Sequence, residues 1–407
     1  MTKPNITERK SFNMFQNNYT ENSFLFKGLI LKNLKIDEIT ETVIAQVEMP
    51  VKEHNCPHCG NITTYIKDYR IQKIRDLPII DKPLIVFFRK RRYICKICNA
   101  TFTENNDYIK RYSHFPCRFY MTAIKEVSTL QSFTSIAKRM HISVSSVIRW
   151  FNNISFPIPK LPSCISIDEF RGNAGGEKFQ CNIADPVNHK TIDILPSRKA
   201  ENLYRYFHKF SQAERLSVRT VVMDLSPLFR SVVKNSFYNA EIIADKFHVI
   251  RLVKNSMENV RKRVQKQFHH EKRRWLKRSR SLLSKNESKL TTTDKIELNR
   301  ILNSSSELEK AYLLNKEFQK IFYQQDKNAA KKALSMWLLL AAKFDIPEFK
   351  HCISTFTNWS TEITNIVNTN LSNGFIEGYN NKIKVLKRVS FGIKNFARLR
   401  NRILFLQ

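Results

Sequence analysis

The chain has no hydrophobic run long enough to cross a membrane. Its longest mostly apolar stretch, 333–342, is much shorter than the roughly 20 residues that a membrane-spanning helix needs. The start of the chain, 1–23, is polar and lacks the apolar centre of a secretory signal peptide. We therefore expect a cytoplasmic protein with reduced thiols, no membrane partner and no small-molecule cofactor.

Acidic residues are also scarce. The 407 residues include 36 Asp and Glu against 69 Lys and Arg, which gives a formal net charge of +33 at pH 7. A compact body with this excess repels itself unless a polyanion is its working partner. The alternative explanation of this charge is nonspecific adhesion or a ribosome-like role. Binding to a membrane surface is less favoured, because the sequence has no basic amphipathic anchor and no lipidation motif. The composition therefore favours nucleic acid, bound in a salt-sensitive way.

Patterning along the chain predicts a multidomain α/β protein. The length suggests two to four domains, and a hydrophobic content of 42% is enough to give them cores. Pro157, Pro159 and Pro162 indicate a stiff linker. The predicted segments are a loosely ordered start (1–27), a zinc-ribbon region (28–110), a helix-turn-helix region (111–155), the first part of a catalytic core (163–250), a basic helical insertion (251–360) and a C-terminal helical segment completing the core (361–407).

Two CxxC pairs, Cys56/Cys59 and Cys95/Cys98, are the strongest local motif. Four thiolates in two such pairs complete a tetrahedral zinc site, and the strand-like sequence between the pairs suits a zinc ribbon. A redox-active CxxC would instead open a helix of a thioredoxin-like unit, which the sequence does not indicate. We therefore expect one structural Zn²⁺. The other cysteines, which lack partner spacing, are predicted to be core thiols: Cys117, Cys164, Cys181 and Cys352.

Residues 132–150 fit two short helices joined by a tight turn. Ser132 and Ser143 are suitable N-caps for the two helices. The pattern is typical of a helix-turn-helix, although His141 stands where such turns usually carry glycine. A plain helical hairpin is the alternative, and the basic composition favours DNA binding. The second helix would present three side chains to a major groove: Ser145, Ser146 and Arg149.

The region after the prolines has the pattern of three meandering strands, a helix, a strand, a helix and a further strand. This is the element order of a ribonuclease-H-like sheet, in which the first and fourth strands are neighbours. The order follows from hydrophobic periodicity and turn residues, without using the acids. The predicted strands are 164–168, 178–184, 191–195, 219–224 and 240–245, and the predicted helices are 198–214 and 227–237.

Three acidic residues are candidates for a catalytic metal site. Asp168 and Asp224 end the first and fourth predicted strands. If these two strands neighbour each other, the carboxylates meet at one sheet end, where open α/β sheets bind ligands. Glu377 lies on a later helix, off its apolar stripe. Three such carboxylates can hold two Mg²⁺ or Mn²⁺ ions against a phosphodiester. Singly, each is more readily an ordinary surface acid, and only the joint pattern favours catalysis. Side chains on the face of Glu377 suit a metal-bound phosphate: Asn381, Lys384 and Arg388.

Asp245 and His248 follow the second aspartate by one helix and one strand. Asp245 could bind metal or transfer a proton, and His248 could orient a phosphate or a water; a polar cap between strand and helix is an equal alternative. Two basic stretches, one beside the second CxxC pair and one in the insertion, are predicted to contact phosphates, with a solvated charged surface as the alternative. Their predicted contacts are Arg89, Lys90, Arg91, Arg92, Arg261, Lys262, Arg263, Arg273 and Arg274.

Taken together, these motifs resemble the ISL3 family of bacterial insertion-sequence transposases. The likeness covers nearly everything from about residue 25 onward, and the joint order of the motifs is specific although each alone is not. It includes the paired CxxC, the helix-turn-helix, Ile167-Asp168-Glu169-Phe170, Val222-Met223-Asp224, Asp245-Lys246-Phe247-His248, and the block from Asn373-Gly374 through Glu377 to Lys384.

The resemblance implies a DDE catalytic core interrupted by the helical insertion, with Asp168, Asp224 and Glu377 as the triad. It implies transposition of double-stranded DNA through terminal inverted repeats, in the bacterial cytoplasm in association with the nucleoid. Because two ends must be cut and joined, a homodimer or larger synaptic complex is expected. Two other functions remain open: a non-catalytic zinc/helix-turn-helix DNA-binding regulator, and a ribonuclease-H-like nuclease without joining activity.

Overall fold

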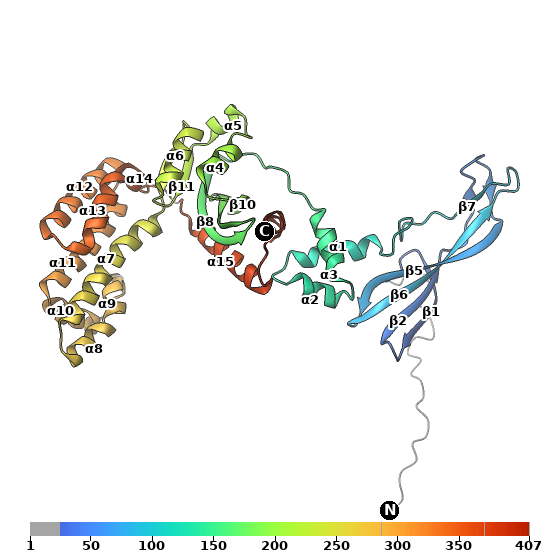
Figure 1. Cartoon of the computed structure of the whole chain (residues 1–407), viewed down its shortest axis with the longest axis horizontal. Helices are drawn as coiled ribbons and strands as arrows, with labels where there is room; N and C mark the ends of the chain where they lie inside the picture. Colours follow the sequence, from blue (N-terminus) through green and yellow to red (C-terminus); the bar gives the residue numbers. More distant parts are fainter. Residues whose placement is uncertain (1–24, 286, 370, 407) are drawn as a thin grey trace, which may run out of the picture. The chain divides into compact units, whose positions relative to one another are not determined.

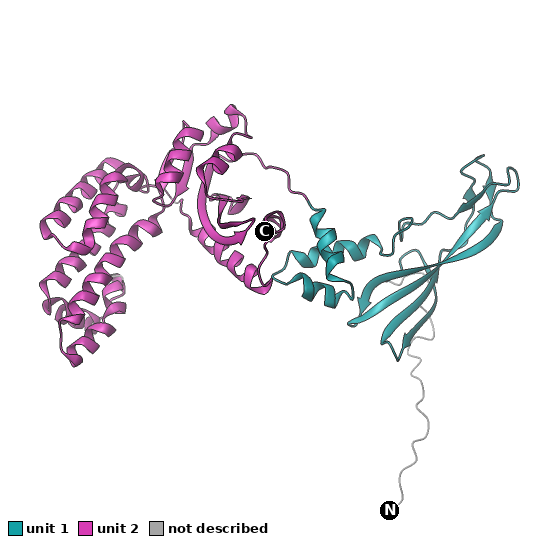
Figure 2. Ribbon diagram, viewed as in Figure 1, with its two compact units in different colours: residues 1–154 teal, residues 155–407 magenta. Residues whose placement is uncertain are grey.

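A computed structural model describes residues 25–285, 287–369 and 371–406 (Figure 1). The chain divides into an N-terminal unit, 1–154, and a C-terminal unit, 155–407 (Figure 2). The predicted proline linker begins the C-terminal unit. Most of the start that was predicted to be loosely ordered, 1–27, lies outside the described residues. Within the described part of the chain, no helix combines the length and apolar character needed to span a bilayer.

The N-terminal unit begins with a twisted five-stranded sheet of order β1-β2-β6-β5, with β7 pairing the far end of β6. Strands β2 and β6 are parallel and the other neighbours are antiparallel. Side chains alternate between the two faces, and Leu84, Val86 and Phe88 of β6 are buried on one of them. The strands are β1 Ile30–Asp37, β2 Thr42–Glu48, β3 His54–Asn55, β4 Ile62–Thr63, β5 Ile66–Ile79, β6 Lys82–Ile94 and β7 Thr101–Thr103, with β3 and β4 forming a separate pair.

Three helices complete this unit: α1 Cys117–Val127, α2 Phe133–Arg139 and α3 Val144–Asn152. Both predicted N-caps are confirmed, because Ser132 accepts a hydrogen bond from the Ser135 amide and Ser143 from the Ser146 amide. His141 has a φ of 51°, so the turn between α2 and α3 does place a histidine in the left-handed region. Its ring nitrogen Nε2 lies 2.8 Å from the Asp81 carbonyl oxygen, which ties the turn to the β5–β6 hairpin.

The C-terminal unit is built on a five-stranded sheet of order β10-β9-β8-β11-β12. The meander β8–β10 is antiparallel, and β11 and β12 are parallel to β8. The predicted neighbour relation of the first and fourth strands is therefore confirmed. The strands are β8 Cys164–Ala174, β9 Glu177–Asp185, β10 Lys190–Leu195, β11 Thr220–Met223 and β12 Glu241–Ala244.

Two boundary predictions in this unit are wrong. The first strand does not end at Asp168 but continues to Ala174, because its second half pairs with β9 after β11 has ended. The single helix predicted over 198–214 is two helices. Ser211 starts the second one through a reciprocal capping box with Glu214, which interrupts the first.

Helices cover both faces of this sheet and extend beyond it. On one face, α15 and α16 pack on Phe170 and Ile194. On the other, a single hydrophobic core runs from the sheet through α4 and α6 into the predicted insertion, without a break between 161 and 367. The helices are α4 Ala200–Phe207, α5 Gln212–Ser217, α6 Pro227–Ser236, α7 Lys246–Lys266, α8 His270–Arg278, α9 Arg280–Ser284, α10 Thr292–Asn303, α11 Ser306–Lys320, α12 Lys327–Phe344, α13 Lys350–Asn358, α14 Ser360–Thr364, α15 Gly374–Val389 and α16 Phe396–Leu404.

Candidate functional site

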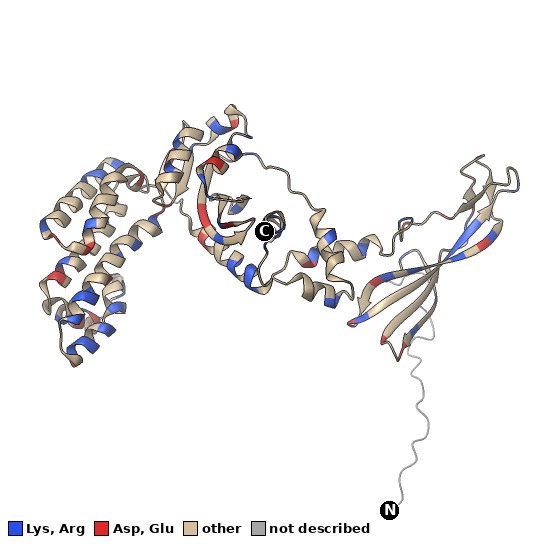
Figure 3. Cartoon of the chain, viewed as in Figure 1, with Lys and Arg blue, Asp and Glu red and all other residues tan. Residues whose placement is uncertain are grey.

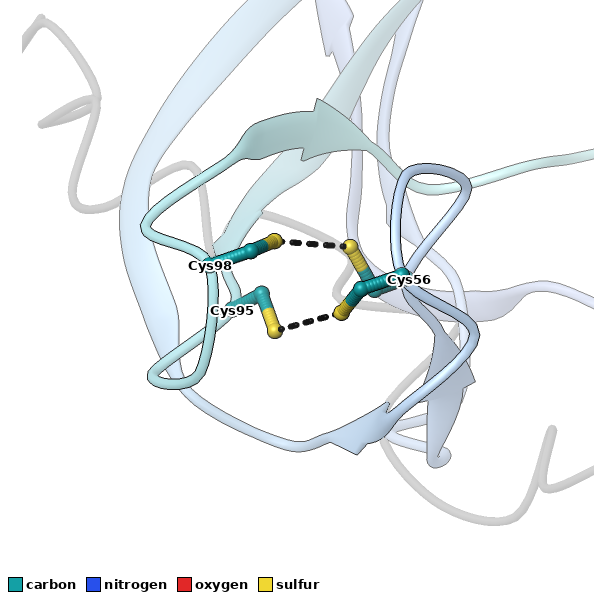
Figure 4. A group of neighbouring side chains, drawn as sticks. Cys56, Cys95 and Cys98 are labelled. Carbon is teal, nitrogen blue, oxygen red and sulfur yellow. Dashed lines mark hydrogen bonds between the residues drawn. The ribbon is translucent and has the colours of Figure 1, made fainter.

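The four cysteines of the CxxC pairs come together at one point of the N-terminal unit (Figure 4). Their sulfur atoms all lie within 4.8 Å of one another, with 3.6 Å between the Sγ atoms of Cys56 and Cys98 and between those of Cys59 and Cys95. A tetrahedron with metal–sulfur bonds of about 2.3 Å has edges of about 3.8 Å. Hydrogen bonds from Asn61 lower the pKa of Cys59 to about 6, which favours the thiolate. The donor set therefore fits one structural Zn²⁺.

The remaining cysteines follow the sequence prediction except at one position. Cys164, Cys181 and Cys352 are buried, as expected for core thiols. Cys117, at the start of α1, is exposed. Cys117 is the first residue of α1 and lies outside the buried stripe of that helix, which is formed by Phe119, Ala123, Ile124 and Val127. The spacing of the cysteines in the sequence does not reveal this position.

A row of three aspartates crosses the parallel half of the C-terminal sheet. Met223 of β11 is aligned with Ile167 of β8 and Ala244 of β12. The residue that follows each of these is an aspartate, so Asp168, Asp224 and Asp245 lie level on three adjacent strands, whose spacing is about 4.8 Å. The backbone bond from the Asp245 amide to the Met223 carbonyl, 2.7 Å, continues the ladder to this level.

Burial disfavours the charged form of the first two of these carboxylates, Asp168 and Asp224. It raises the pKa of Asp168 to about 7, and it also raises the pKa of Asp224. Oxygen Oδ1 of Asp224 is buried and has no hydrogen-bond partner among the described residues. An orphaned carboxylate oxygen beside a second buried carboxylate is a donor set that fits hard divalent cations. Asp168 and Asp224 can therefore hold Mg²⁺ or Mn²⁺.

The third aspartate of the row, Asp245, already has hydrogen-bond partners. Asp245 caps α7 through the Phe247 amide, and its Oδ2 lies 2.6 Å from Nδ1 of His248. Because a carboxylate only accepts hydrogen bonds, the imidazole carries its proton on Nδ1. This hydrogen bond raises the pKa of His248, and the nearby charges of Asp224 and Asp168 act in the same direction. The pair is thus an oriented imidazole beside the candidate metal ligands.

Glu377 lies on α15, and its helix reaches the aspartates through a residue that sequence reasoning missed. Asn380 donates from Nδ2 to Oδ2 of Asp168 at 2.8 Å, and its Oδ1 accepts from Asn182 of β9 at 3.1 Å. Both asparagines are buried, whereas Glu377, one turn earlier, is exposed. The signal available in the sequence was an asparagine three residues after the candidate glutamate, next to the apolar stripe.

Among the described residues, only the four cysteines gather three or more candidate ligand atoms within 4.8 Å of one another. The carboxylates of Asp168, Asp224 and Glu377 are spread more widely than that. Two-metal sites hold their ions about 3.5–4 Å apart, so their ligands span a larger volume than those of a single zinc. Glu377 is on the helix that touches Asp168, and its assignment as the third ligand stays a prediction. Asn381, Lys384 and Arg388 are exposed on that helix, where Lys384 donates to Asn381 at 3.0 Å.

A further carboxylate that the sequence analysis did not propose lies beside this site. Glu169 follows Asp168 on β8 and forms an ion pair with Arg198, whose Nη1 lies 2.8 and 2.6 Å from its two oxygens. Both charges act on Asp224: the negative charge of Glu169 raises the pKa of Asp224, and the positive charge of Arg198 lowers it. The residue was part of the motif around Asp168, but alternation along a strand gave no reason to single it out.

Lys and Arg occur throughout both units (Figure 3), but the predicted basic contacts differ in their accessibility. Arg91 is buried with Glu48 and Glu104, and Arg261 is buried with Glu258 and the Leu276 carbonyl. Arg263 is held by two acids of other helices, Glu307 and Glu348, and Arg92 pairs with Asp68 at 2.9 Å. The predicted DNA contacts that are exposed are Arg89, Lys262, Arg273 and Arg274 for phosphates and Ser145 and Arg149 for a major groove, whereas Lys90 and Ser146 are half-buried.

The pairing of Arg263 has a simple physical reason. Counting acids within the basic stretch suggested that its cations lacked partners, but folding brings Glu307 and Glu348 from distant segments onto α7. Arg261 instead pairs with Glu258 of its own helix. Arg261 and Arg263 are therefore structural in this fold, as is Arg91 in the N-terminal sheet. None of the three presents a free guanidinium to a ligand.

Comparison with known proteins assigns both units. Residues 165–403, more than half of the chain, match the model of the DDE-type ISL3 transposases, and residues 52–98 match the zinc finger of the transposases IS204/IS1001/IS1096/IS1165. The protein is thus of the DDE transposase class. More specifically, the chain belongs to the ISL3 family of insertion-sequence transposases.

Individual relatives agree with this assignment. The transposase for insertion sequence element IS1001 of Bordetella parapertussis is 22% identical over 348 residues, which cover 84% of this chain and 85% of that protein. The transposase for IS1557 of Mycobacterium tuberculosis is 23% identical and covers 52% of this chain and 53% of its own length. A Lactococcus lactis protein named ATP-dependent protease is 32% identical over only 30% of this chain.

Proposed function

We propose that this protein is a DNA transposase that cuts the terminal inverted repeats of an insertion sequence and joins the freed 3′ ends to target DNA. Family membership supports the class of reaction, and the row of Asp168, Asp224 and Asp245 supports the position of the chemistry. The strand order β10-β9-β8-β11-β12 supports the proposed ribonuclease-H-like core. The observation that carries the proposal is the pair of half-buried carboxylates, Asp168 and Asp224, of which Asp224 has a buried oxygen with no hydrogen-bond partner among the described residues.

In this proposal Asp168, Asp224 and Glu377 hold two Mg²⁺ or Mn²⁺ ions, which would activate the attacking oxygen and stabilise the leaving one. A water oxygen bonds to phosphorus, the bond from phosphorus to the 3′ oxygen breaks, and a 3′-hydroxyl is left on the element. Asn380 fixes the orientation of Asp168, and Asp245 fixes that of His248, which can hold a phosphate oxygen or a water. The freed 3′-hydroxyl oxygen then bonds to a target phosphorus at the same place, and the bond from that phosphorus to the 3′ oxygen of the target strand breaks, which leaves a 3′-hydroxyl on the target.

DNA binding is proposed to be shared among separate parts of the chain. The N-terminal zinc ribbon and the helices α2 and α3, read as a helix-turn-helix, would recognise the element ends. Arg149 and Ser145 are exposed on α3, and Arg89 is exposed beside the ribbon, stacked on Tyr69 at 3.7 Å. Lys262, Arg273 and Arg274 of the helical insertion and Lys384 of α15 would hold phosphates nearer the cut. In this proposal two copies of the chain pair the two element ends. The reaction takes place in the bacterial cytoplasm, in association with the nucleoid.

The experiment that tests this function starts from the DNA flanking the coding region. Matching inverted ends are made as labelled duplexes and incubated with the full-length protein, Mg²⁺ and a target plasmid. We expect cleaved ends and joined products. Cleavage without joining would identify a nuclease. Binding of the ends without any cleavage, unchanged by Mg²⁺ in the wild-type protein, would identify a DNA-binding regulator.

A further inference from the structure

A groove of about 690 Å³, with a mixed polar and apolar lining, opens beside Asp224 and His248. One wall is a stripe of α7 and the other is a stripe of α13. On each helix the lining residues recur at the same offsets of three and seven, which place them on one helix face. These residues are His248, Arg251 and Asn255 on α7, and His351, Ser354 and Asn358 on α13.

The walls of this groove are fixed to the catalytic sheet. Arg230 of α6 donates to both carboxylate oxygens of the buried Glu362, at 2.6 and 2.7 Å, and to the Asn358 carbonyl at 3.0 Å. The same guanidinium lies 4.3 Å from the ring centre of Trp359. Below the groove, Ser256 and Cys352 join the two helices with 3.2 Å between Oγ and Sγ. The groove is therefore a formed part of the fold.

The charge of the lining suits a phosphate backbone. Asp224, at the catalytic end, is the only acid in it. Arg251 is exposed, and no acid in the described part of the chain forms an ion pair with it, in contrast to Arg261 and Arg263. Amide and hydroxyl side chains of the walls can donate to phosphate and sugar oxygens. Leu252 and Trp359 give the groove apolar surface on which a sugar or base can lie.

The volume of the groove distinguishes one strand from two. It is within the range of pockets that bind single small ligands. A duplex, whose major groove alone is about 12 Å wide, is far larger. We propose that this groove binds a single strand of DNA next to the phosphate that is cut, with Arg251 as a positioning residue for its backbone. The inference rests on the proposed function and adds to it that the two strands separate at the cleavage site.

The test compares two forms of an element end: a fully paired duplex and the same end with an unpaired flank at the cleavage junction. Affinities are measured by fluorescence anisotropy in the Asp168→Asn background, so that the DNA stays intact. The parent protein should bind the unpaired form more tightly. Arg251→Ala should reduce this preference by roughly ten-fold or more, since it removes a charge-assisted contact. Lys254→Ala, which removes an equal charge from an exposed residue outside the groove, should preserve it.

A photoreactive thymidine analogue in the flank provides a second measurement, with crosslinks expected in peptides of α7 and α13. Asn255→Ala serves as a second groove variant should Arg251→Ala fold poorly. Equal preference in the groove variants and in Lys254→Ala, or crosslinks confined to other elements, would overturn the inference. If the wild-type protein leaves its ends uncut in Mg²⁺, the proposed function fails instead. If it cuts them while the groove variants match the Lys254→Ala control, only the groove assignment fails.

Discussion

Replacing Asp168 by asparagine should abolish cleavage of the element ends and at the same time stabilise the metal-free protein at alkaline pH. The substitution keeps the size of the side chain and an oxygen that can accept the hydrogen bond from Asn380. It removes a carboxylate whose charged form is disfavoured by burial. End binding, which is assigned to other parts of the chain, should be unchanged.

The sign and size of the stability effect follow from the pKa of Asp168, about 7 in the folded protein against an ordinary value of 3.8. Because the folded state holds this proton more tightly than the unfolded chain, the favourable contribution is complete below pH 3.8 and is lost as pH rises to about 7. The difference corresponds to roughly 4 kcal/mol at most. Asp168→Asn should therefore match the wild type near pH 4 and exceed it at pH 8 by up to about that amount.

Denaturant unfolding at the two pH values checks this, without added Mg²⁺ and without a chelator that would strip zinc. Emission from Trp275, Trp337 and Trp359 reports on the C-terminal unit, whereas Trp150 belongs to the other unit. Added Mg²⁺ should raise the stability of the wild type at pH 8 and leave the variant unaffected, because ligands stabilise only the state that binds them. A variant that is less stable than the wild type by the same amount at both pH values would refute the reasoning.

Three other predictions follow from other contacts in the structure. Cys98→Ser should reduce bound zinc from one ion per chain to none and destabilise the N-terminal unit alone, as metal counting and limited proteolysis would reveal. Asn380→Ala should lower the cleavage rate by about ten-fold or more with end binding unchanged, whereas Val385→Ala, at an exposed position of the same helix, should have little effect. Arg230→Met should cost about 3–5 kcal/mol in the free energy of unfolding because it leaves Glu362 buried without its partner. Combining it with Glu362→Gln should recover part of that loss; no recovery would mean that the pair does not explain the cost.

The features that the sequence predicted well depend on local patterns. Hydrophobic alternation located the strands of the C-terminal sheet, and the order of those strands predicted that Asp168 and Asp224 lie on neighbouring strands. The paired CxxC motifs predicted the cysteine cluster, since ligand spacing is a local property. Capping residues and the exceptional turn at His141 were equally readable.

The features that it missed depend on contacts between distant segments. The strand through Asp168 runs on because β9 keeps pairing with it, which hydrophobicity near Asp168 does not encode. Asn380 was passed over because its importance comes from Asp168, more than 200 residues away. The charges of Arg91 and Arg263 looked available for DNA, but folding pairs each of them with acids that are distant in the sequence. Charge counting along a chain therefore overestimates how many cations a fold leaves for a ligand.

The unbroken core from 161 to 367 has a consequence for anyone who wishes to miniaturise this enzyme. If the helical insertion, 251–360, folded independently, it could be deleted and the flanking ends reconnected. Because it shares its core with the sheet, its deletion would expose apolar surface of the sheet and leave a protein prone to aggregation. The natural place to cut is the border between 154 and 155. Exchanging the N-terminal unit, which we propose recognises the element ends, for another DNA-binding module is therefore the route by which the C-terminal unit could be retargeted intact.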